Sequence, residues 1–303
     1  MAQPRARHEP LFGISVEPVA EGIEMMFEVA RIADEHELDL LAVQDHPYLS
    51  NYLDAWTLLV ALATSSNHIS VMPNVINLPL RTPAMVAKAA ATLSLLSGGR
   101  IELGVGAGIL ADGIEAYGGP RRTRGETVDA FKEAVTVMRA LWNVEADGLY
   151  EGHYYYLRGS KSGPPPAKPI RIWAGAYGPR MLQLTGAMCD GWTPSNTFAL
   201  PENIPEMQRM IDNGARGAGR DPAQVRRGYN LMGIITDAPE TRDDNWLVTT
   251  PEGWVDALVG YYRDLGLDSF ILWPPTPDAV NQTQRFVTEV VPQAKRAISK
   301  LRM

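Results

Sequence analysis

Leu11-Phe-Gly-Ile-Ser-Val16 is a short apolar run, and the segment that follows it, Ala20–His36, has apolar residues at helical spacing. These residues are Ile23, Met26, Phe27, Ala30, Ile32 and Ala33. A continuous apolar run followed by a helical pattern predicts one buried strand and one amphipathic helix. This strand and helix are the unit that repeats along the rest of the chain.

Further pairs of a strand and a helix follow in the same rhythm. In the first half they are Leu40–Val43 with Tyr52–Ser65, Ile69–Ile76 with Pro83–Leu96, and Arg100–Val105 with Arg124–Trp142. In the second half they are Ile170–Ala174 with Pro179–Met188, Asp190–Thr193 with Pro201–Arg216, Gly228–Thr236 with Pro251–Leu265, and Ser269–Trp273 with Ala279–Leu301. Near-continuous apolar strands are typical of parallel strands that helices cover. The eight pairs predict an α/β fold, a single (β/α)8 TIM barrel domain over residues 1–303.

Two segments interrupt this rhythm, and we expect them to be insertion loops at the C-terminal face of the barrel. Leu149–Leu157 is aromatic with a glycine turn and predicts a hairpin, and the proline-rich stretch Gly159–Pro169 follows it. That stretch could be a domain linker, but the alternation continues after it, which favours one domain. The second segment, Asp237–Thr250, includes Asp243-Asp244-Asn245-Trp246 and is long enough for a lid or binding loop.

The composition is that of a globular protein, because 45% of the 303 residues are hydrophobic and 21% are charged. Acidic residues outnumber basic ones, 35 against 28, and the net charge is -7. Nucleic-acid binders usually present a concentrated basic face, so nucleic acid is not an expected partner. The one local basic cluster, Arg121-Arg122-Thr123-Arg124, is either a solvated helix start or a contact for the polyanionic tail of a ligand.

The single cysteine, Cys189, cannot form an internal disulfide, and we expect it to be a small buried residue. The segment Met1–Pro10 carries charges without an apolar core behind them, and the longest apolar stretch, Leu58–Ala63, is far shorter than the roughly 18 residues of a membrane span. These observations predict a cytoplasmic protein that is neither exported nor bound to a membrane, with a small molecule as its partner.

The active site of a (β/α)8 barrel lies at the C-terminal ends of its strands, so the residues after each apolar run are the candidates. They are Glu17, Gln44-Asp45-His46, Asn74, Asn77, Gly104–Gly108, Gly175–Pro179, Ser195-Asn196, Asn230 and Trp273-Pro274. Among the five histidines, His46 is the best placed to transfer a proton near neutral pH, although a lone histidine at a strand end is often only structural.

Two glycine-rich segments could hold a ligand. Gly104-Val-Gly-Ala-Gly108 lacks the third glycine of a dinucleotide fingerprint, because its sixth position is Ile109, and the loop-like stretch Leu110–Pro120 follows. These glycines would instead let a flat ligand lie on the backbone. Gly175-Ala-Tyr-Gly-Pro-Arg180 opens a helix, where free backbone N–H groups bind phosphate, unless it is a plain helix start.

Other chemistries have weaker support in the sequence. No cluster of His, Cys or acidic residues has the spacing of metal ligands, and no Gly-x-Ser-x-Gly motif is present. We therefore expect no metal site, and a hydrolase on this fold is disfavoured.

The sequence resembles the bacterial luciferase-like flavin-dependent oxidoreductases, in particular the branch that includes deazaflavin-dependent enzymes. The resemblance covers nearly the whole chain, and its most specific part is Leu95-Leu-Ser-Gly-Gly-Arg-Ile-Glu-Leu-Gly-Val-Gly106. It also includes Gln44–His46, Val75–Pro83, Gly175–Arg180, Asp190-Gly-Trp192 and Phe270–Pro274.

The resemblance implies a (β/α)8 barrel that holds a deazaflavin, coenzyme F-420, or FMN. The residues that it places around the cofactor are Asn74, Val75, Gly106, Ala107, Gly108, Gly175, Ala176, Tyr177, Gly178, Pro179 and Arg180, with the phosphate at the helix start. It implies a non-prolyl cis peptide at Asn74 and Val75, behind the ring. It also implies that His46 lies beside the reacting carbon and handles a proton, and that Asp45 orients His46 or contacts the ring. Members of the family often form dimers, so a homodimer is expected.

Departures from the family pattern narrow the substrate. Deazaflavin-dependent sugar-phosphate dehydrogenases have a glutamate after the glycine run, where this chain has Ile109, and a lysine after strand six, near Phe198 here. A sugar phosphate is therefore a doubtful substrate. Several residues are consistent with an aromatic pocket, although each could equally be part of the core: Glu17, Tyr48, Tyr52, Trp56, Phe198, Trp246 and Trp273.

The predicted function is an oxidoreductase that transfers a hydride between F-420 and a small organic substrate, with His46 as proton donor or acceptor. One alternative is an FMN-dependent monooxygenase that uses reduced FMN and oxygen. Another is a barrel that binds a flavin without catalysis.

Overall fold

The computed structural model describes residues 8–159, 163–240, 242 and 244–302, and it confirms the predicted barrel. Parallel strands form the wall in the order β3-β2-β1-β12-β10-β9-β8-β5-β4. They are β1 (Leu11–Val16), β2 (Leu40–Val43), β3 (Ser70–Pro73), β4 (Ile76–Asn77), β5 (Leu103–Gly106), β8 (Ile172–Gly175), β9 (Gly191–Trp192), β10 (Arg226–Ile235) and β12 (Ser269–Trp273). A parallel bridge between Val71 and Ile101 joins β3 to the segment before β5 and closes the barrel.

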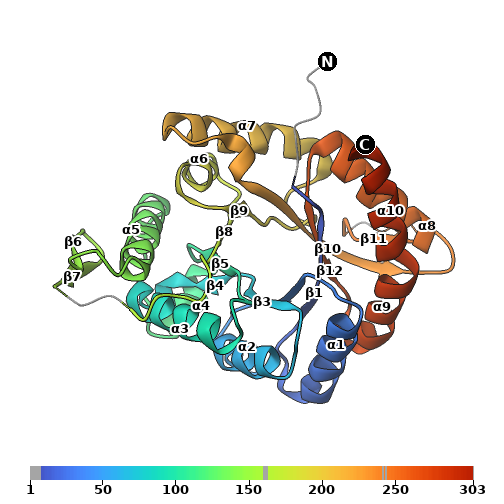
Figure 1. Cartoon of the computed structure of the whole chain (residues 1–303), viewed down its shortest axis with the longest axis horizontal. Coiled ribbons are helices and arrows are strands. Elements are labelled where there is room, and N and C mark those ends of the chain that lie inside the picture. Colours follow the sequence, from blue (N-terminus) through green and yellow to red (C-terminus); the bar gives the residue numbers. More distant parts are fainter. Residues whose placement is uncertain (1–7, 160–162, 241, 243, 303) are drawn as a thin grey trace.

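Helices surround this ring of strands (Figure 1). They are α1 (Ile23–Glu35), α2 (Ala55–Thr64), α3 (Pro83–Leu96), α4 (Ala111–Ala116), α5 (Arg124–Trp142), α6 (Pro179–Met188), α7 (Ile204–Gly217), α8 (Pro251–Gly260), α9 (Ala279–Arg285) and α10 (Val291–Arg302). The predicted helices after β10 and β12 contain π-helical turns at Tyr261–Leu265 and Phe286–Val290, and the second of these separates α9 from α10.

Alternate residues of each strand face opposite sides of the wall. In β2, Leu41 and Val43 belong to the large core between the strands and the helices, whereas Leu40 and Ala42 belong to a smaller separate cluster. The other buried members of the small cluster are Met72, Trp173 and Ile271. This cluster fills the inside of the barrel with side chains, which leaves the C-terminal ends of the strands as the place for a site.

The third strand is where the structure departs most from a regular barrel. The sequence predicts one strand over 69–76, but the chain forms β3 and β4 with a cis peptide bond between Asn74 and Val75. This confirms the break that the family resemblance implies at these residues. After the break, β4 pairs with β5 through Ile76 and Asn77.

Two predicted loops contain regular structure. The stretch Leu110–Pro120 reads as loop-like, yet it forms α4, because Ile114 is buried and anchors the short helix. The segment Asp237–Thr250 contains β11 (Leu247–Thr249), which pairs in parallel with the end of β10. Within that segment Asp243 lies outside the described residues.

The predicted hairpin is confirmed as the antiparallel strands β6 (Leu149–Glu151) and β7 (Tyr156–Arg158), which stand outside α5 (Figure 1). Glu133 on α5 holds the hairpin turn, because its carboxylate accepts backbone N–H bonds from His153, Tyr154 and Tyr155 at 2.8 to 3.0 Å. Burial raises the pKa of Glu133, but these three bonds together lower it below its ordinary value.

The basic cluster before α5 is a helix start, as one of its two interpretations predicts. The Thr123 hydroxyl accepts from the Glu126 N–H and the Glu126 carboxylate accepts from the Thr123 N–H, which is a capping box. Arg121 pairs with Asp112 and Glu115 on α4.

Cys189 is fully buried, as expected, and burial raises the pKa of its thiol to about 12. In the part of the chain that the structure describes, no helix is both long and apolar enough to cross a membrane. The segment Met1–Arg7, on which part of the localisation prediction depends, lies outside the described residues.

Candidate functional site

Val75 lies at the centre of the candidate site, directly after the cis peptide. Its side chain occupies the space beside two glycines on neighbouring strands. A Cβ on Gly106 would lie 2.5 Å from a Val75 methyl carbon, and a Cβ on Gly175 would lie 3.3 Å from the same carbon. From the sequence, we expected these two positions to be glycine because a ligand contacts their backbone. The structure shows another reason: a larger side chain at either position would collide with or crowd the Val75 side chain.

Asn74, on the other side of the cis bond, belongs to a buried polar network. Its amide group donates to Oδ1 of Asn230 at 2.7 Å, and its Oδ1 accepts from the Thr193 hydroxyl at 3.2 Å. The Asn230 amide in turn donates to the Thr193 carbonyl at 3.3 Å. A satisfied buried network of this kind fixes its members in one arrangement, so it holds the backbone at Asn74 in place.

Asp45 follows β2 and is buried in an ion pair with Arg81. The Arg81 guanidinium donates to both carboxylate oxygens of Asp45 at 2.8 and 2.9 Å and also pairs with Asp54 at the start of α2. The Asn77 N–H donates to Asp45 at 3.0 Å. These bonds raise the pKa of Arg81, with the bond to Asp45 as the largest cause. The carboxylate of Asp45 thereby ties the end of β2 to the segment that follows the cis peptide.

The His46 ring makes its hydrogen bond with Tyr48 rather than with Asp45. Nδ1 of His46 lies 2.6 Å from the Tyr48 hydroxyl oxygen. Burial lowers the pKa of His46, and the nearby charge of Asp45 opposes this without cancelling it. Burial and Asp45 raise the pKa of Tyr48, against a hydrogen bond from the Asn77 side chain. At neutral pH both side chains are therefore uncharged. A catalytic role for Asp45 or His46 stays a prediction.

Helix α4 covers Tyr48. A Cβ on Gly113 would lie 2.9 Å from the Tyr48 ring, so the ring packs on bare helix backbone. Ile114 is buried and anchors the helix beside Gly108, where an added Cβ would lie 2.7 Å from both the Ile114 and the Pro79 side chain. Gly108 itself has a φ of 92°, in the left-handed region that favours glycine.

The remaining predicted cofactor residues lie on two adjacent segments after β5 and β8. Ala107 is half-buried after β5, and the buried Ala176 accepts a hydrogen bond from the Trp192 indole at 2.9 Å. Gly178 caps α6 and Pro179 is its first residue, so the backbone N–H groups of the first turn point away from the helix body. Arg180 pairs at 3.0 Å with Asp129 on α5, and both side chains are exposed.

The loop after β9 meets these residues from the next strand. The Ser195 N–H donates to the Tyr177 hydroxyl at 3.1 Å, and the Tyr177 ring contacts Phe198 edge-on. Phe198 is 68% exposed, which is unusual for a phenylalanine. Asn196 donates to the backbone carbonyl of Asn245 at 3.0 Å and so connects this loop to the segment before β11.

Glu17, after β1, belongs to a second polar group at this end of the barrel. Its carboxylate accepts from the Thr276 hydroxyl at 2.7 Å and from the Gln44 amide at 3.5 Å. Gln44 also donates to the Tyr52 hydroxyl at 3.0 Å. Burial and the charge of Glu17 raise the pKa of Tyr52 to about 12. Of the residues expected in an aromatic pocket, Trp273 is buried and Phe198 is exposed, and a shared pocket stays a prediction.

The residues present fit a flat polar cofactor at these strand ends. Oδ1 of Asn77 is buried and has no hydrogen-bond partner among the described residues, so a ligand with a donor group would satisfy it. A Cβ on Gly178 would meet nothing within 4 Å, so the start of α6 is open. An open helix N-terminus favours an anion.

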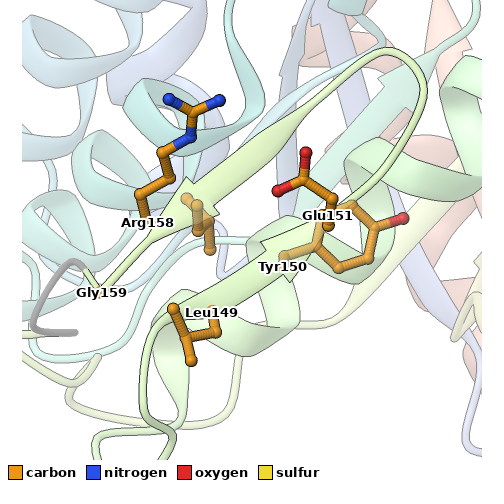
Figure 2. A pocket seen from close by; sticks show the side chains of 6 residues that line it. Leu149, Tyr150, Glu151, Arg158 and Gly159 are labelled. Atoms are coloured by element: carbon orange, nitrogen blue, oxygen red, sulfur yellow. The ribbon is translucent and has the colours of Figure 1, made fainter.

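Two surface cavities lie away from the strand ends. One, of about 520 Å³, is on the outer hairpin, where Leu149, Tyr150, Glu151, Arg158 and Gly159 line it (Figure 2). The other, of about 480 Å³, lies between α1 and the start of α9. Within the described ranges, no group of three or more His, Cys, Asp or Glu residues could hold a metal ion.

Sequence reasoning missed two residues of this site, Arg81 and Gly113, and it considered Tyr48 only as part of an aromatic pocket. Arg81 carried a signal, because it is a lone charge in the apolar segment between β4 and α3, but only the fold shows that it faces Asp45. Gly113 and the hydroxyl of Tyr48 carried none, since their contacts depend on how α4 packs. Asn230 was among the strand-end candidates, and the structure joins it to Asn74.

Two kinds of reductase are among the curated relatives of the chain. The chain is 34% identical over 208 residues to the phthiodiolone/phenolphthiodiolone dimycocerosates ketoreductase of Mycobacterium tuberculosis, which is 67% of this chain and 52% of the relative. It is 31% identical over 233 residues to the 5,10-methylenetetrahydromethanopterin reductase of Archaeoglobus fulgidus, 77% of this chain and 67% of that protein. The chain thus spans about half the length of the ketoreductases that it matches.

Solved structures share the fold at low identity. An F420-dependent secondary alcohol dehydrogenase in complex with an F420-acetone adduct superposes with a TM-score of 0.83 at 19% identity, over 95% of this chain and 99% of that one. The monooxygenase RslO1 from Streptomyces bottropensis has a TM-score of 0.78 at 20% identity, over 93% and 99%. The family of luciferase-like monooxygenases matches residues 10–269. The chain therefore belongs to the luciferase-like monooxygenase family.

Proposed function

We propose that this protein is an oxidoreductase that transfers a hydride between coenzyme F420 and a carbonyl compound or the corresponding alcohol. The observation that carries the proposal is the presence, at the same end of the barrel, of an uncharged histidine, His46, and of the Val75 side chain that stands beside Gly106 and Gly175. The names of the relatives support the substrate class, because they include a ketoreductase and, among solved structures, a secondary alcohol dehydrogenase with an acetone adduct.

When bound, the deazaflavin supplies or accepts the hydride, so the protein needs no nucleophile of its own. Val75, Gly106 and Gly175 would contact one face of the ring, and the buried Oδ1 of Asn77 would accept a hydrogen bond from a ring N–H. The first turn of α6, with Gly178 and Arg180, would hold the phosphate.

His46 would provide the proton side of the reaction. In carbonyl reduction, its ring would donate a proton to the substrate oxygen, and in alcohol oxidation it would accept one. Asp45, fixed by Arg81, would place a negative charge near His46 and favour its charged form, so a proton that His46 accepts would be stabilised.

A second candidate is an FMN-dependent monooxygenase. The fold supports it, because the monooxygenase RslO1 and a riboflavin lyase solved with modified FMN share the barrel, the latter with a TM-score of 0.81. We place it second because the methylenetetrahydromethanopterin reductase, at 31% identity, is closer in sequence than either. A homodimer and a cytoplasmic location stay predictions.

The cofactor is tested by native mass spectrometry of the purified protein with equal concentrations of oxidised F420 and FMN. The proposal expects one F420 per chain and no displacement by a tenfold excess of FMN. FMN binding that excludes F420, together with oxygen consumption when a flavin reductase is added, would make the monooxygenase the better assignment. The variant Arg209→Gln, which removes an exposed arginine of α7 that pairs with Glu206, serves as a control for nonspecific anion binding.

A further inference from the structure

His46 and Tyr48 share a short side-chain hydrogen bond close to Asp45, whose carboxylate accepts the Asn77 backbone N–H. The phenol oxygen of Tyr48 lies 2.6 Å from Nδ1 of His46. Burial, the largest cause, and the charge of Asp45 raise the pKa of the Tyr48 phenol, and the Asn77 side chain partly opposes them. Among the described residues, the hydrogen bond that fixes the phenol is the one with His46.

The direction of this bond follows from the chemistry of its two groups. A phenol hydroxyl is a stronger donor than a neutral imidazole N–H, and an imidazole nitrogen is a stronger acceptor than a phenol oxygen, so the Tyr48 hydroxyl donates to His46. The carboxylate of Asp45 does not compete for that proton, because Arg81 and the Asn77 N–H occupy its oxygens. Nδ1 of His46 is then the acceptor, and the neutral imidazole carries its hydrogen on Nε2.

Helix α4 keeps the phenol in this position. The ring of Tyr48 packs on Gly113, where a Cβ would come within 2.9 Å of it. The charges of α4 face elsewhere, since Asp112 and Glu115 both pair with Arg121. The Tyr48 ring is therefore held in one position, in which its hydroxyl bonds to His46 and not to a carboxylate of α4.

We infer that Tyr48, held against α4, is a positioning residue that fixes His46 in the Nε2–H tautomer and passes a proton to Nδ1 when Nε2 donates its own. The inference deepens the proposed function and rests on it, because it assigns the source of the proton. It favours carbonyl reduction, since an Nε2–H group donates.

The proton transfers balance as follows for a ketone. The carbonyl carbon receives the hydride that reduced F420 supplies, a C–H bond forms, and the C=O π electrons move to oxygen. That oxygen takes the proton of Nε2, and Nδ1 takes the proton of the Tyr48 hydroxyl. The resulting phenolate regains a proton from water. The transfer is favourable because an alkoxide is a much stronger base than a phenolate.

The first test reads the tautomer of His46 in the protein without cofactor, by 15N NMR of the histidine side chains. The signal of His46 among the five histidines is assigned by its loss in His46→Gln. We expect the wild-type ring to be almost entirely Nε2–H and Tyr48→Phe to show a mixture of both tautomers. The control Tyr52→Phe removes a neighbouring hydroxyl that bonds to Gln44, and it should leave the tautomer unchanged. An unchanged tautomer in Tyr48→Phe would overturn the inference.

The second test measures turnover. Tyr48→Phe should lower kcat for ketone reduction at least tenfold and reduce the solvent deuterium isotope effect, while KM and the Kd for F420 stay within twofold. If Tyr48→Phe does not fold, Gly113→Ala displaces the ring with its hydroxyl intact and should give the same NMR change. If the wild-type protein transfers hydride but His46 keeps its tautomer in both Tyr48→Phe and Gly113→Ala, the role of Tyr48 is contradicted and the proposed function is not. If His46 of the wild-type protein is in the Nε2–H tautomer but no hydride is transferred, the proposed function is contradicted and the role of Tyr48 in fixing the tautomer is not.

Discussion

The side chain of Val75 occupies the space where a side chain on Gly106 would stand, with 2.5 Å between a Val75 methyl carbon and a Cβ built on Gly106. Val75 lies in the connection that leads into β4, directly before Ile76. Gly106 lies at the end of β5, directly after Val105, and Val105 pairs with Ile76. The cis bond that precedes Val75 and the glycines of β5 are thus parts of one arrangement.

This relationship predicts that Gly106→Ala disturbs the site through Val75. The added methyl group overpacks a buried position, and we expect a loss of about 1 to 3 kcal/mol in the free energy of unfolding, measured by urea denaturation. Cofactor affinity should fall with it. The control is Gly217→Ala at the end of α7, where a Cβ meets nothing within 4 Å, so it should be neutral or slightly stabilising. Equal effects of the two substitutions would contradict this account.

The ion pair of Asp45 and Arg81 predicts unequal effects of removing the two carboxylates that Arg81 binds. The side chain of Asp45 is 1% exposed and that of Asp54 is 45% exposed. Asp45→Asn should cost about 2 to 3 kcal/mol of stability, because it leaves a half-buried guanidinium without its main partner. Asp54→Asn should cost less than about 1 kcal/mol, since the pair is exposed and asparagine still caps α2. If Asp54→Asn lowers the free energy of unfolding more than Asp45→Asn does, the buried pair of Asp45 and Arg81 is not the one that stabilises the fold most.

The titration of His46 gives a prediction with a definite sign. Burial lowers its pKa below the ordinary 6.5, and Asp45 partly opposes this, so Asp45→Asn should lower the pKa further. NMR titration of the ring measures both values. Because the unfolded chain binds the proton more readily, His46 should also make the free energy of unfolding decrease as the pH falls through 6.5 toward the folded pKa. A rise of the His46 pKa in Asp45→Asn would contradict this electrostatic assignment.

The hairpin should depend on the charge of Glu133. Its lowered pKa means that the three N–H bonds to its carboxylate persist above the ordinary pKa of 4.5 and weaken as the pH falls through the lowered value. Glu133→Gln should therefore increase hydrogen exchange of the amides in 149–158 by roughly tenfold, about 1.4 kcal/mol, with little change in the barrel. Glu151→Gln, on the same hairpin, should leave exchange unchanged, and a similar increase in both variants would contradict the role of Glu133.

The start of α6 predicts the response of cofactor binding to Arg180. Arg180→Gln should weaken F420 binding about threefold to tenfold, because an exposed charge contributes at most roughly 1 kcal/mol to an anion site, and the loss should shrink in high salt. Fluorescence titration measures the Kd. If Arg180→Gln leaves the F420 affinity unchanged at low salt, the phosphate does not bind at the start of α6.

The sequence was sufficient for the barrel, because its strands and helices alternate strongly enough to be counted. The interior cluster with Trp173 follows from the alternation within each strand. The site was predictable where Asp45 and His46 follow β2, and Asn230 was among the candidates although the structure places it within β10. The partners of these residues were not predictable, since Arg81 reaches Asp45 across the break in strand three and Gly113 reaches Tyr48 from a helix that the sequence suggested was a loop. Such contacts depend on packing between segments far apart in the chain.

The most direct test of the central claim follows a labelled hydride. Reduced F420 carrying deuterium at C5 is mixed with the protein and a panel of ketones under anaerobic conditions, and the alcohol product is analysed by mass spectrometry. We predict deuterium on the carbinol carbon, and at least a tenfold lower rate in His46→Ala with F420 affinity within twofold of wild type. Failure to transfer the label to any ketone, together with oxidation of a substrate by reduced FMN and oxygen, would contradict the account.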